Sequence, residues 1–578
     1  MDTFEEKLSG ELSGLTKDQF AAVMHGCGRA VCLAGPGSGK TRVISLRAAR
    51  LWYACENGGR GSEENIGAVL TLSFNRPACG EMRSRGVEYI KRLGGRNTDS
   101  AGFFTVHAYC FRLLREYLAG RGSAVPRVLD PDETSRMIEG LYGQLSGGRR
   151  LPGDEMKKLK SFILTETGEP DFEFGGLSGE LAVEISKKYT AAKRKLGLID
   201  FGDMLGLTLE YLRDDEKLRK RAKAAYAFTQ VDEAQDLSEA QAGIIELISN
   251  GNILYVADDD QSIYGFRGAN PGTVRSLVNG DHNFKTYMLE KNFRSGSDIV
   301  SASSWFIRAN DDRFAKKISA ARQTCGEVTL RYFRDTGTQA AFCAELLKKR
   351  AQKKRSACVL YRNNVSGLPV LAALYFAAGK DRSMIPRVRG ERTLFSESGY
   401  VKKLYDEIKR REEDLGNGKK AFAAVPLPYD IYRRLEREKK IDLIAAAEFG
   451  GRRPFLKNAV MCAAETVLKH SLSADEFLNF SEEIDNYCDC EAERLLNLST
   501  VHSAKGLEYD TVVIIDCVEG EFPFGDVRKE EHLREERRLM YVAMTRAKNE
   551  LTVSCPGRCG KMLLNASRFA GEIEDSMR

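Results

Sequence analysis

Two segments far apart in this chain carry residue types that could bind a nucleotide and hydrolyse it. Residues 34–41 form a glycine-rich stretch that ends in Lys40 and Thr41. Glycines let the backbone approach phosphates closely, and successive N–H groups can surround the phosphate oxygens. Lys40 would reach the β- and γ-phosphates, and Thr41 would offer its hydroxyl to Mg²⁺. The predicted phosphate-binding loop comprises Ala34, Gly35, Pro36, Gly37, Ser38, Gly39, Lys40 and Thr41.

The second segment is acidic and supplies the groups that such a loop needs as partners. Both segments follow short apolar runs, residues 31–34 and 228–231, which indicate buried strands. Parallel strands deliver the loops after them to the same edge of a sheet, so the two segments would meet there. Asp232 would hold Mg²⁺, and Glu233 would orient the attacking water. A carboxylate-rich helix N-terminus is the simpler alternative, which the preceding strand and Lys40 disfavour.

The composition is that of an ordinary globular protein. The chain has 578 residues, of which 42% are hydrophobic and 29% charged, enough for several domains. Its net charge of +6 is compatible with a polyanionic partner. The N-terminal residues are acidic and no apolar run reaches membrane-spanning length, so we expect a cytoplasmic protein. The 14 cysteines are typical of reduced thiols, and the spacings of Cys488, Cys490, Cys555 and Cys559 do not favour a metal site.

Alternating strand and helix patterns predict an α/β fold with parallel sheets. The simplest arrangement is two α/β lobes that share one nucleotide, each interrupted by a mostly helical insertion. The expected strands are residues 31–34, 69–74, 228–231, 253–257, 286–289, 328–333, 358–361, 511–515 and 551–554. The expected domains are residues 1–107 with 199–275 (first lobe), 108–198 (its helical insertion), 276–380 with 497–578 (second lobe) and 381–496 (a short helical insertion).

Further motifs lie at residues 15–19, 258–269, 289–295, 499–508 and 535–547. These motifs, in this order, resemble superfamily 1 DNA helicases of the UvrD, Rep and PcrA type over nearly the whole chain. The resemblance implies two RecA-like lobes of the phosphate-loop type, ATP and Mg²⁺ as cofactors, and 3′-to-5′ movement along single-stranded DNA. The short insertion resembles a reduced form of the subdomain that the family calls 2B.

The resemblance implies roles for four residues around the nucleoside. Gln19 would hydrogen-bond the adenine edge, and Glu508 would contact the ribose. Arg42 and Phe293 would sandwich the adenine ring, although the family usually has Tyr where Phe293 stands. A core aromatic is the alternative interpretation of Phe293.

Three more residues are implied at the γ-phosphate. Gln261 follows a predicted strand and would couple the γ-phosphate to DNA binding. Arg294 and Arg546 would act as arginine fingers from the second lobe. Two arginines on a lobe that lacks its own phosphate loop make sense if closure brings them to a shared nucleotide.

The resemblance also implies a set of DNA contacts. Phe266 stands where the family usually has Trp, and a smaller ring should still stack on a base. His107 and His502 have a structural hydrogen-bonding role as their alternative. Arg537 and Arg538 lie in a Glu-rich helix and are interpreted as intramolecular ion pairs. The implied DNA-binding residues are Phe74, Asn75, Thr105, His107, Tyr264, Phe266, Arg267 and His502.

Together these features predict an ATP-dependent DNA helicase or single-strand translocase. Its partners would be single-stranded DNA and single/double-strand junctions. One alternative is a DNA-stimulated ATPase or translocase subunit of a repair, recombination or defence complex that does not unwind DNA alone, and the short insertion motivates it. A binding module with a degenerate ATP site is disfavoured because Lys40, Asp232 and Glu233 are intact. RNA stays open as the bound strand, since stacking contacts tolerate either sugar.

Overall fold

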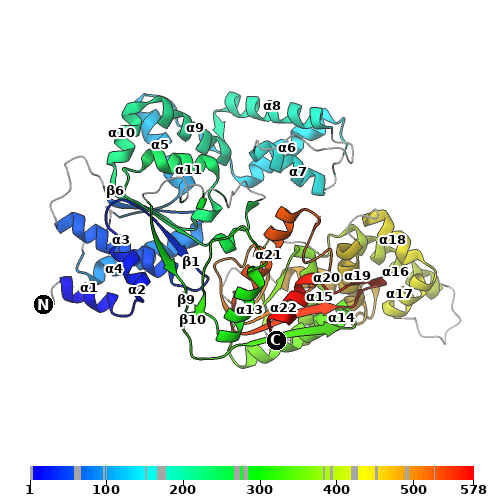
Figure 1. Cartoon of the computed structure of the whole chain (residues 1–578). Coiled ribbons are helices and arrows are strands. Elements are labelled where there is room, and N and C mark those ends of the chain that lie inside the picture. Colours follow the sequence, from blue (N-terminus) through cyan, green and yellow to red (C-terminus); the bar gives the residue numbers. More distant parts are fainter. Residues whose placement is uncertain are drawn as a thin grey trace. The chain divides into compact units, whose positions relative to one another are not determined.

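The protein is described by a computed structural model that divides into two compact units, Met1–Glu290 (unit 1) and Lys291–Arg578 (unit 2) (Figure 1). None of the helices in the described ranges is both long and apolar enough to cross a membrane. The structure describes residues 4–57, 67–95, 98, 101–149, 151, 153–165, 178–265, 272, 274–275, 278, 284–379, 381, 384–390, 395–417, 427–449, 454–487, 494–525 and 527–577.

Unit 1 is built on a six-stranded sheet with the order β3-β2-β6-β7-β1-β8, in which every pair of neighbours is parallel. Its central strands are apolar and buried along almost their whole length, so they need helices on both faces. The strands of unit 1 are β1 (Arg29–Ala34), β2 (Gly67–Ser73), β3 (Ala101–Thr105), β4 (Arg127–Val128), β5 (Leu198–Ile199), β6 (Tyr226–Val231), β7 (Ile253–Ala257) and β8 (Lys285–Leu289).

Two groups of helices surround this sheet in unit 1. In the first group, α3 packs on α2 and α4; in the second, α5 packs on α9, which also contacts α10 and α11. The helices of unit 1 are α1 (Phe4–Leu12), α2 (Lys17–Met24), α3 (Lys40–Asn57), α4 (Arg76–Arg92), α5 (Val106–Gly120), α6 (Pro131–Leu145), α7 (Gly153–Thr165), α8 (Gly179–Leu196), α9 (Phe201–Asp214), α10 (Glu216–Ala224) and α11 (Glu239–Ile248), with single 3₁₀ turns at Ala234–Asp236 and Asp259–Gln261.

The helical insertion of unit 1 has an apolar cluster of its own. Helices α6, α7 and α8 pack on one another around a separate apolar cluster that includes Ile138, Leu159 and Ile185 (cyan in Figure 1). Helix α5, which was expected inside the insertion, instead packs on α9 and β3 and so belongs to the lobe. By its packing, α5 thus groups with the lobe, whereas the predicted boundary at residue 108 placed it in the insertion.

Unit 2 contains a second parallel sheet with the order β11-β16-β15-β12-β14-β13. Its strands and those of two small ribbons are β9 (Lys291–Asn292), β10 (Ser319–Ala320), β11 (Glu327–Phe333), β12 (Ala357–Tyr361), β13 (Arg387–Arg389), β14 (Leu496–Thr500), β15 (Tyr509–Ile514), β16 (Ala547–Pro556), β17 (Arg558–Cys559) and β18 (Met562–Leu563). The helices are α13 (Ser297–Ile307), α14 (Thr336–Gln352), α15 (Leu368–Ala378), α16 (Gly399–Asn417), α17 (Pro428–Arg437), α18 (Lys440–Phe449), α19 (Pro454–Leu468), α20 (Ala474–Tyr487), α21 (Glu530–Met544) and α22 (Arg568–Ser576).

The insertion of unit 2, helices α16–α20, shares one hydrophobic core with the lobe that carries it. Residues of the insertion such as Leu404 and Phe477 belong to the same buried cluster as Leu347, Leu374 and Val359 of the lobe. Helix α19 packs on both α14 and α15. Sliding these helices off the lobe would expose apolar surface, so the insertion is fixed to the lobe rather than joined to it by a linker.

The α/β fold with two parallel sheets is confirmed, and all nine predicted strands are present. The predicted boundary at residue 276 differs from the structure: the strand at Lys285–Leu289 pairs with β1, so residues up to Glu290 belong to unit 1. The prediction also missed β3 (Ala101–Thr105). Its Gly102 lies where a Cβ atom would stand 2.7 Å from the hydroxyl of Tyr226, and this close approach explains a glycine inside a strand.

Candidate functional site

The phosphate-binding loop joins the end of β1 to the start of α3. The N–H of Gly35 donates to Leu289 O at 3.0 Å and fastens the loop to β8. Gly37 and Gly39 have φ angles of 63° and 83°, which favour glycine, and Ser38 Oγ donates to Gly35 O at 2.7 Å. These contacts hold the loop in a compact turn that leads directly into the N-terminus of α3. A glycine-rich loop before a helix N-terminus is the arrangement that binds phosphate groups.

Gln19 of α2 contacts this loop directly. Its Nε2 donates to Ser38 O at 2.8 Å, and its Oε1 accepts from Thr16 N at 3.0 Å. Thr16 Oγ1 accepts in return from Gln19 N at 3.2 Å, so the two residues form a capping box at the start of α2. The residue predicted to contact adenine therefore also couples the α2 N-terminus to the phosphate loop.

A buried arginine fixes the other end of α2. Arg47 of α3 is fully buried, and burial lowers its pKa to about 9. It donates to His25 O at 3.2 Å and to Gln230 Oε1 at 2.9 Å. Arg50 Nη2 donates to the same carbonyl of His25 at 3.0 Å. These bonds satisfy carbonyls at the C-terminal end of α2 and tie this helix to β6.

The acidic segment begins directly after β6, as predicted. Asp232 is buried, and its N–H donates to Leu72 O of β2 at 2.8 Å. Glu233 has a φ of 51°, a left-handed conformation that costs a non-glycine residue about 1 kcal/mol or more. Gln235 Nε2 donates to Glu233 Oε2 at 2.5 Å and orients this carboxylate. Such strain is concentrated at functional sites, and here it falls on the predicted general base.

Lys40 faces a carboxylate for which no role was predicted. Its Nζ lies 3.6 Å from Oδ2 of Asp258, a fully buried residue at the end of β7. Gln261 Nε2 donates to the same oxygen at 2.6 Å, and Asp258 N donates to Gln235 Oε1 at 2.9 Å. One network thus joins Lys40, Gln261 and the Glu233 segment. Asp258 and Gln235, which connect them, were missed because their partners are distant in the chain.

Three of the predicted DNA-binding residues of unit 1 form ring contacts. Phe74 and Tyr264 stack on each other, with ring centroids 5.3 Å apart and planes 22° apart. His107 and Phe201 form a T-shaped contact with ring centroids 5.4 Å apart, and burial lowers the pKa of the His107 imidazole. Because burial favours the neutral ring, His107 offers a hydrogen bond rather than a charge.

Asn75 and Thr105 have a structural role that the sequence analysis did not assign. Asn75 Oδ1 accepts from Ala78 N at 2.8 Å and caps α4. Thr105 Oγ1 accepts from Ala108 N at 3.2 Å and caps α5. An Asn or Thr just before a helical pattern is a typical N-cap, so this signal was present in the sequence. Phe266 and Arg267 lie outside the described residues.

In unit 2, Arg294 and Glu508 form an ion pair. Arg294 Nε donates to Glu508 Oε2 at 2.7 Å, and Lys548 Nζ lies 2.8 Å from Glu508 Oε1. Partial burial alone would raise the pKa of Glu508, but the charge of Arg294 and the hydrogen bond from Lys548 lower this pKa to about 2. Glu508, predicted at the ribose, therefore contacts a predicted arginine finger.

The second predicted finger lies beside this pair. Arg546 is 1% exposed; its Nε donates to Val542 O at 2.9 Å and its Nη1 to Leu507 O at 3.2 Å. Arg294 Nη1 donates to Thr545 O at 3.1 Å, so backbone carbonyls hold both guanidinium groups. Phe293 is 45% exposed and is not a core aromatic. His502, after β14, is half-buried.

Two further interpretations concern Arg537, Arg538 and the cysteines. The ion pairs are confirmed: Arg537 lies 2.8 Å from Glu572 and Arg538 3.0 Å from Asp312. Both acidic partners lie outside helix α21, which carries the two arginines. All cysteines in the described ranges are free thiols, and Cys488 and Cys490 lie outside those ranges.

Comparisons with known proteins agree with this geometry. The model of the UvrD/REP helicase N-terminal domain matches residues 15–280, and that of the UvrD-like helicase C-terminal domain matches residues 287–370 and 431–556. The chain belongs to the UvrD-like helicase family, whose members are ATP-hydrolysing enzymes.

Curated relatives match along nearly the whole chain. The DNA helicase II of Haemophilus influenzae is 26% identical over 95% of this chain and 84% of its own length. The ATP-dependent DNA helicase UvrD1 of Mycobacterium tuberculosis is 26% identical over 98% of this chain and 86% of its own. The DNA helicase II of Escherichia coli is 25% identical over 98% of this chain and 88% of its own length. The unmatched segment between the two parts of the C-terminal model, residues 371–430, includes the start of the insertion in unit 2.

Proposed function

We propose that this protein is an ATP-dependent, Mg²⁺-requiring DNA helicase that moves 3′-to-5′ along single-stranded DNA. The observation that carries the proposal is the network in unit 1 that joins Lys40 of the phosphate loop to Asp258, Gln261 and the Glu233 segment. It couples the residue that would hold phosphate to the residue that would activate water.

The residues present fit ATP and Mg²⁺. The phosphate-binding loop and the N-terminus of α3 supply backbone N–H groups for phosphate oxygens. Lys40 would exchange its contact with Asp258 for the negatively charged phosphates. Thr41 and the buried Asp232 would hold Mg²⁺, which shields phosphate charge when it is bound. Gln19 and Arg42 would lie at the adenine, where Arg42 Nη1 already donates to Gly14 O at 3.2 Å.

Hydrolysis would need groups from both units. Glu233, oriented by Gln235, would position the attacking water. Arg294 and Arg546 of unit 2 would stabilise the charge that develops on the transferred phosphoryl group. The low pKa of Glu508 keeps its carboxylate ionised at physiological pH. We therefore propose that Glu508 orients the guanidinium of Arg294, in addition to the ribose contact that the family resemblance implies.

DNA would bind beside the aromatic side chains that follow the β-strands of the unit 1 sheet. The stacked pair Phe74 and Tyr264 is a platform for bases, and aromatic stacking tolerates any base sequence. Tyr264 is three residues after Gln261, so a change at the nucleotide could reach the DNA through a short segment. His502 and the implied residues Phe266 and Arg267 would add contacts.

The proposal is tested with the isolated protein on three substrates: duplexes with a 3′ tail, with a 5′ tail, and with blunt ends. ATP-driven strand separation of the 3′-tailed duplex alone is the expected result. Unwinding of the 5′-tailed duplex would contradict the polarity, and no DNA-stimulated ATP hydrolysis at all would contradict the function.

One observation favours a second candidate, a translocase that serves a larger complex and does not unwind DNA alone. The insertion α16–α20 shares its core with the lobe, so in the described part of the chain it does not form a separate body that could reorient on duplex DNA. Single-strand-stimulated ATP hydrolysis without separation of any duplex would favour this candidate over the first.

A further inference from the structure

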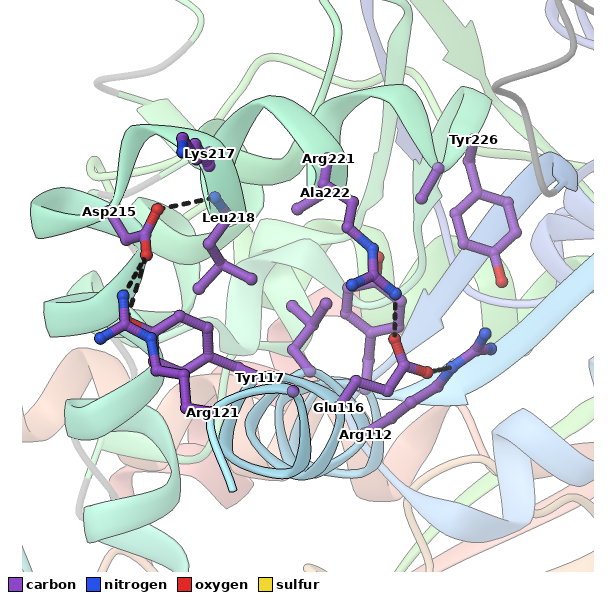
Figure 2. A pocket seen from close by; sticks show the side chains of 14 residues that line it. Arg112, Glu116, Tyr117, Arg121, Asp215, Lys217, Leu218, Arg221, Ala222 and Tyr226 are labelled. Atoms are coloured by element: carbon purple, nitrogen blue, oxygen red, sulfur yellow. Dashed lines mark hydrogen bonds and ion pairs between the residues drawn. The ribbon is translucent and has the colours of Figure 1, made fainter. Parts of the chain in front are cut away.

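A pocket of about 240 Å³ opens on unit 1 between α5, α10 and the first residue of β6 (Figure 2). Its apolar lining includes Leu113 of α5, Leu218 and Ala222 of α10, and the ring of Tyr226. Leu218 and Ala222 are four residues apart and so lie on the same face of α10. The pocket therefore presents an apolar floor between two helices.

Charged side chains border this floor. Arg112 Nε lies 2.9 Å and Arg221 Nη2 3.6 Å from the carboxylate of Glu116. On the opposite side, Arg121 Nη2 lies 2.8 Å from Asp215 Oδ2. Figure 2 shows Glu116 between Arg112 and Arg221, and Asp215 in contact with Arg121 and with the backbone N–H of Leu218.

The border carries more positive than negative charge. Four cationic side chains line the pocket against two carboxylates, the fourth cation being Lys217. Asp215 also caps α10, since its Oδ1 accepts from Leu218 N at 3.0 Å, and Tyr117 Oη donates to its Oδ2 at 3.2 Å. Lys217 and Arg221 lie one helical turn apart and are exposed. The pocket thus favours a negatively charged ligand.

The pocket lies away from the nucleotide site. Tyr226 is the first residue of β6, whereas Asp232 follows the last. A strand of this length spans roughly 20 Å, so the pocket and the carboxylate of Asp232 lie at opposite edges of the sheet. None of the residues that line the pocket belongs to the ATP or DNA site proposed above, and the function of this surface is therefore separate from theirs.

The size and charge of the pocket indicate its ligand. Its volume is below the roughly 300–1,000 Å³ of pockets that enclose a whole small molecule, so it suits a single large side chain. An apolar anchor in a pocket with a polar rim is the usual form of a peptide interface. We propose that this pocket docks an acidic segment of a partner protein through one aromatic or large aliphatic side chain. Single-stranded nucleic acid is the alternative ligand, and the competition experiment below distinguishes it from an acidic peptide.

The test uses fluorescence anisotropy with the full chain and a labelled peptide of about ten residues that carries several Asp and one Phe. At low salt we expect saturable binding, and we expect the same peptide with Phe replaced by Ala to bind about tenfold more weakly or worse. Equal binding of the two peptides, or no binding of either, would overturn the proposal.

Charge variants locate the binding on the protein. The double variant Lys217→Glu with Arg221→Glu should weaken the peptide by about tenfold or more. The matched control is Lys220→Glu with Lys223→Glu, which makes the same charge change on α10 at residues that do not line the pocket. If both double variants weaken peptide binding equally, the attraction is a non-specific effect of charge, and the assignment of the peptide to this pocket is overturned. Displacement of the peptide by a single-stranded oligonucleotide would overturn its assignment to a protein partner.

The same variants separate this proposal from the proposed function. Both double variants should keep wild-type thermal unfolding and wild-type ATP hydrolysis with single-stranded DNA, since their residues lie outside that machinery. A loss of DNA-stimulated hydrolysis specific to the Lys217→Glu, Arg221→Glu variant would assign the pocket to the motor and contradict a separate docking site.

Discussion

Glu508 Oε2 accepts a hydrogen bond from Arg294 Nε at 2.7 Å, although the two residues are 214 positions apart in the chain. The contact places a carboxylate of low pKa against an arginine that we propose to act on the phosphoryl group. Its second oxygen is engaged by Lys548. The geometry is that of a positioning residue, since the carboxylate restricts the guanidinium to one orientation.

We therefore expect Glu508→Gln to lower kcat by about ten- to a hundredfold, because small misplacements of a transition-state group have effects of this size. The KM for ATP should change much less. Steady-state ATP hydrolysis with single-stranded DNA measures both, and Lys548→Met, which leaves the Arg294 contact in place, is the control. A rise in KM at unchanged kcat would instead support the ribose contact alone.

Gln19→Ala should weaken ATP binding and leave the fold intact. The change removes the hydrogen bond from Nε2 to Ser38 O and half of the capping box. One such bond contributes about 1 kcal/mol, so the KM for ATP should rise by roughly five- to tenfold. Titration with a fluorescent ATP analogue measures the effect directly. Affinity equal to that of the wild type would show that Gln19 supports only the start of α2.

Tyr264→Ala should reduce the response to DNA. A stacked base is worth about 1–3 kcal/mol, so we expect affinity for single-stranded DNA to fall by roughly five- to a hundredfold. Basal ATP hydrolysis should survive. Tyr332 of β11, an exposed tyrosine outside the predicted DNA-binding set, provides the control substitution Tyr332→Ala. If both variants bind DNA equally well, the pair Phe74 and Tyr264 is only a packing contact.

Asp516 predicts a pH dependence of stability. Burial raises its pKa from 3.8 to about 8, and Gln339 Nε2 donates to its Oδ1 at 2.6 Å. A carboxyl whose pKa is raised by folding contributes stability that is complete below its unfolded pKa and is lost as pH rises through its folded pKa. The free energy of unfolding should therefore fall between about pH 4 and pH 8, by at most about 1.4 kcal/mol per pH unit.

Asp516→Asn isolates this contribution. The amide oxygen can still accept from Gln339, and Asn tolerates the φ of 57° found at this position. Urea unfolding at a series of pH values should show that the free energy of unfolding of the variant rises relative to that of the wild type as pH rises toward 8. If the free energies of unfolding of the two proteins depend on pH in the same way, Asp516 is ionised in the folded state.

Much of the candidate nucleotide site followed from local patterns in the sequence. The strand before the phosphate loop and the strand before Asp232 were both found, because buried parallel strands are continuous apolar runs. The contacts of Lys40 with Asp258 and of Arg294 with Glu508 were not found. Each joins residues that only the folded sheet brings together, and no spacing along the chain encodes them.

The boundary between the lobes has a similar cause. Lys285–Leu289 was identified as a strand, but the predicted boundary at residue 276 lay before it. Its pairing with β1 is set by the whole first sheet. The caps at Asn75 and Thr105, in contrast, were visible in the sequence and were interpreted only as DNA contacts.

The most direct measurement of the central claim is ATP hydrolysis by the full chain with and without single-stranded DNA, compared with Lys40→Ala. We predict hydrolysis that rises with DNA in the wild type and is absent in the variant, whose circular dichroism spectrum should be unchanged. A wild type that does not respond to DNA, or a Lys40→Ala protein that hydrolyses ATP at the wild-type rate, would contradict the account.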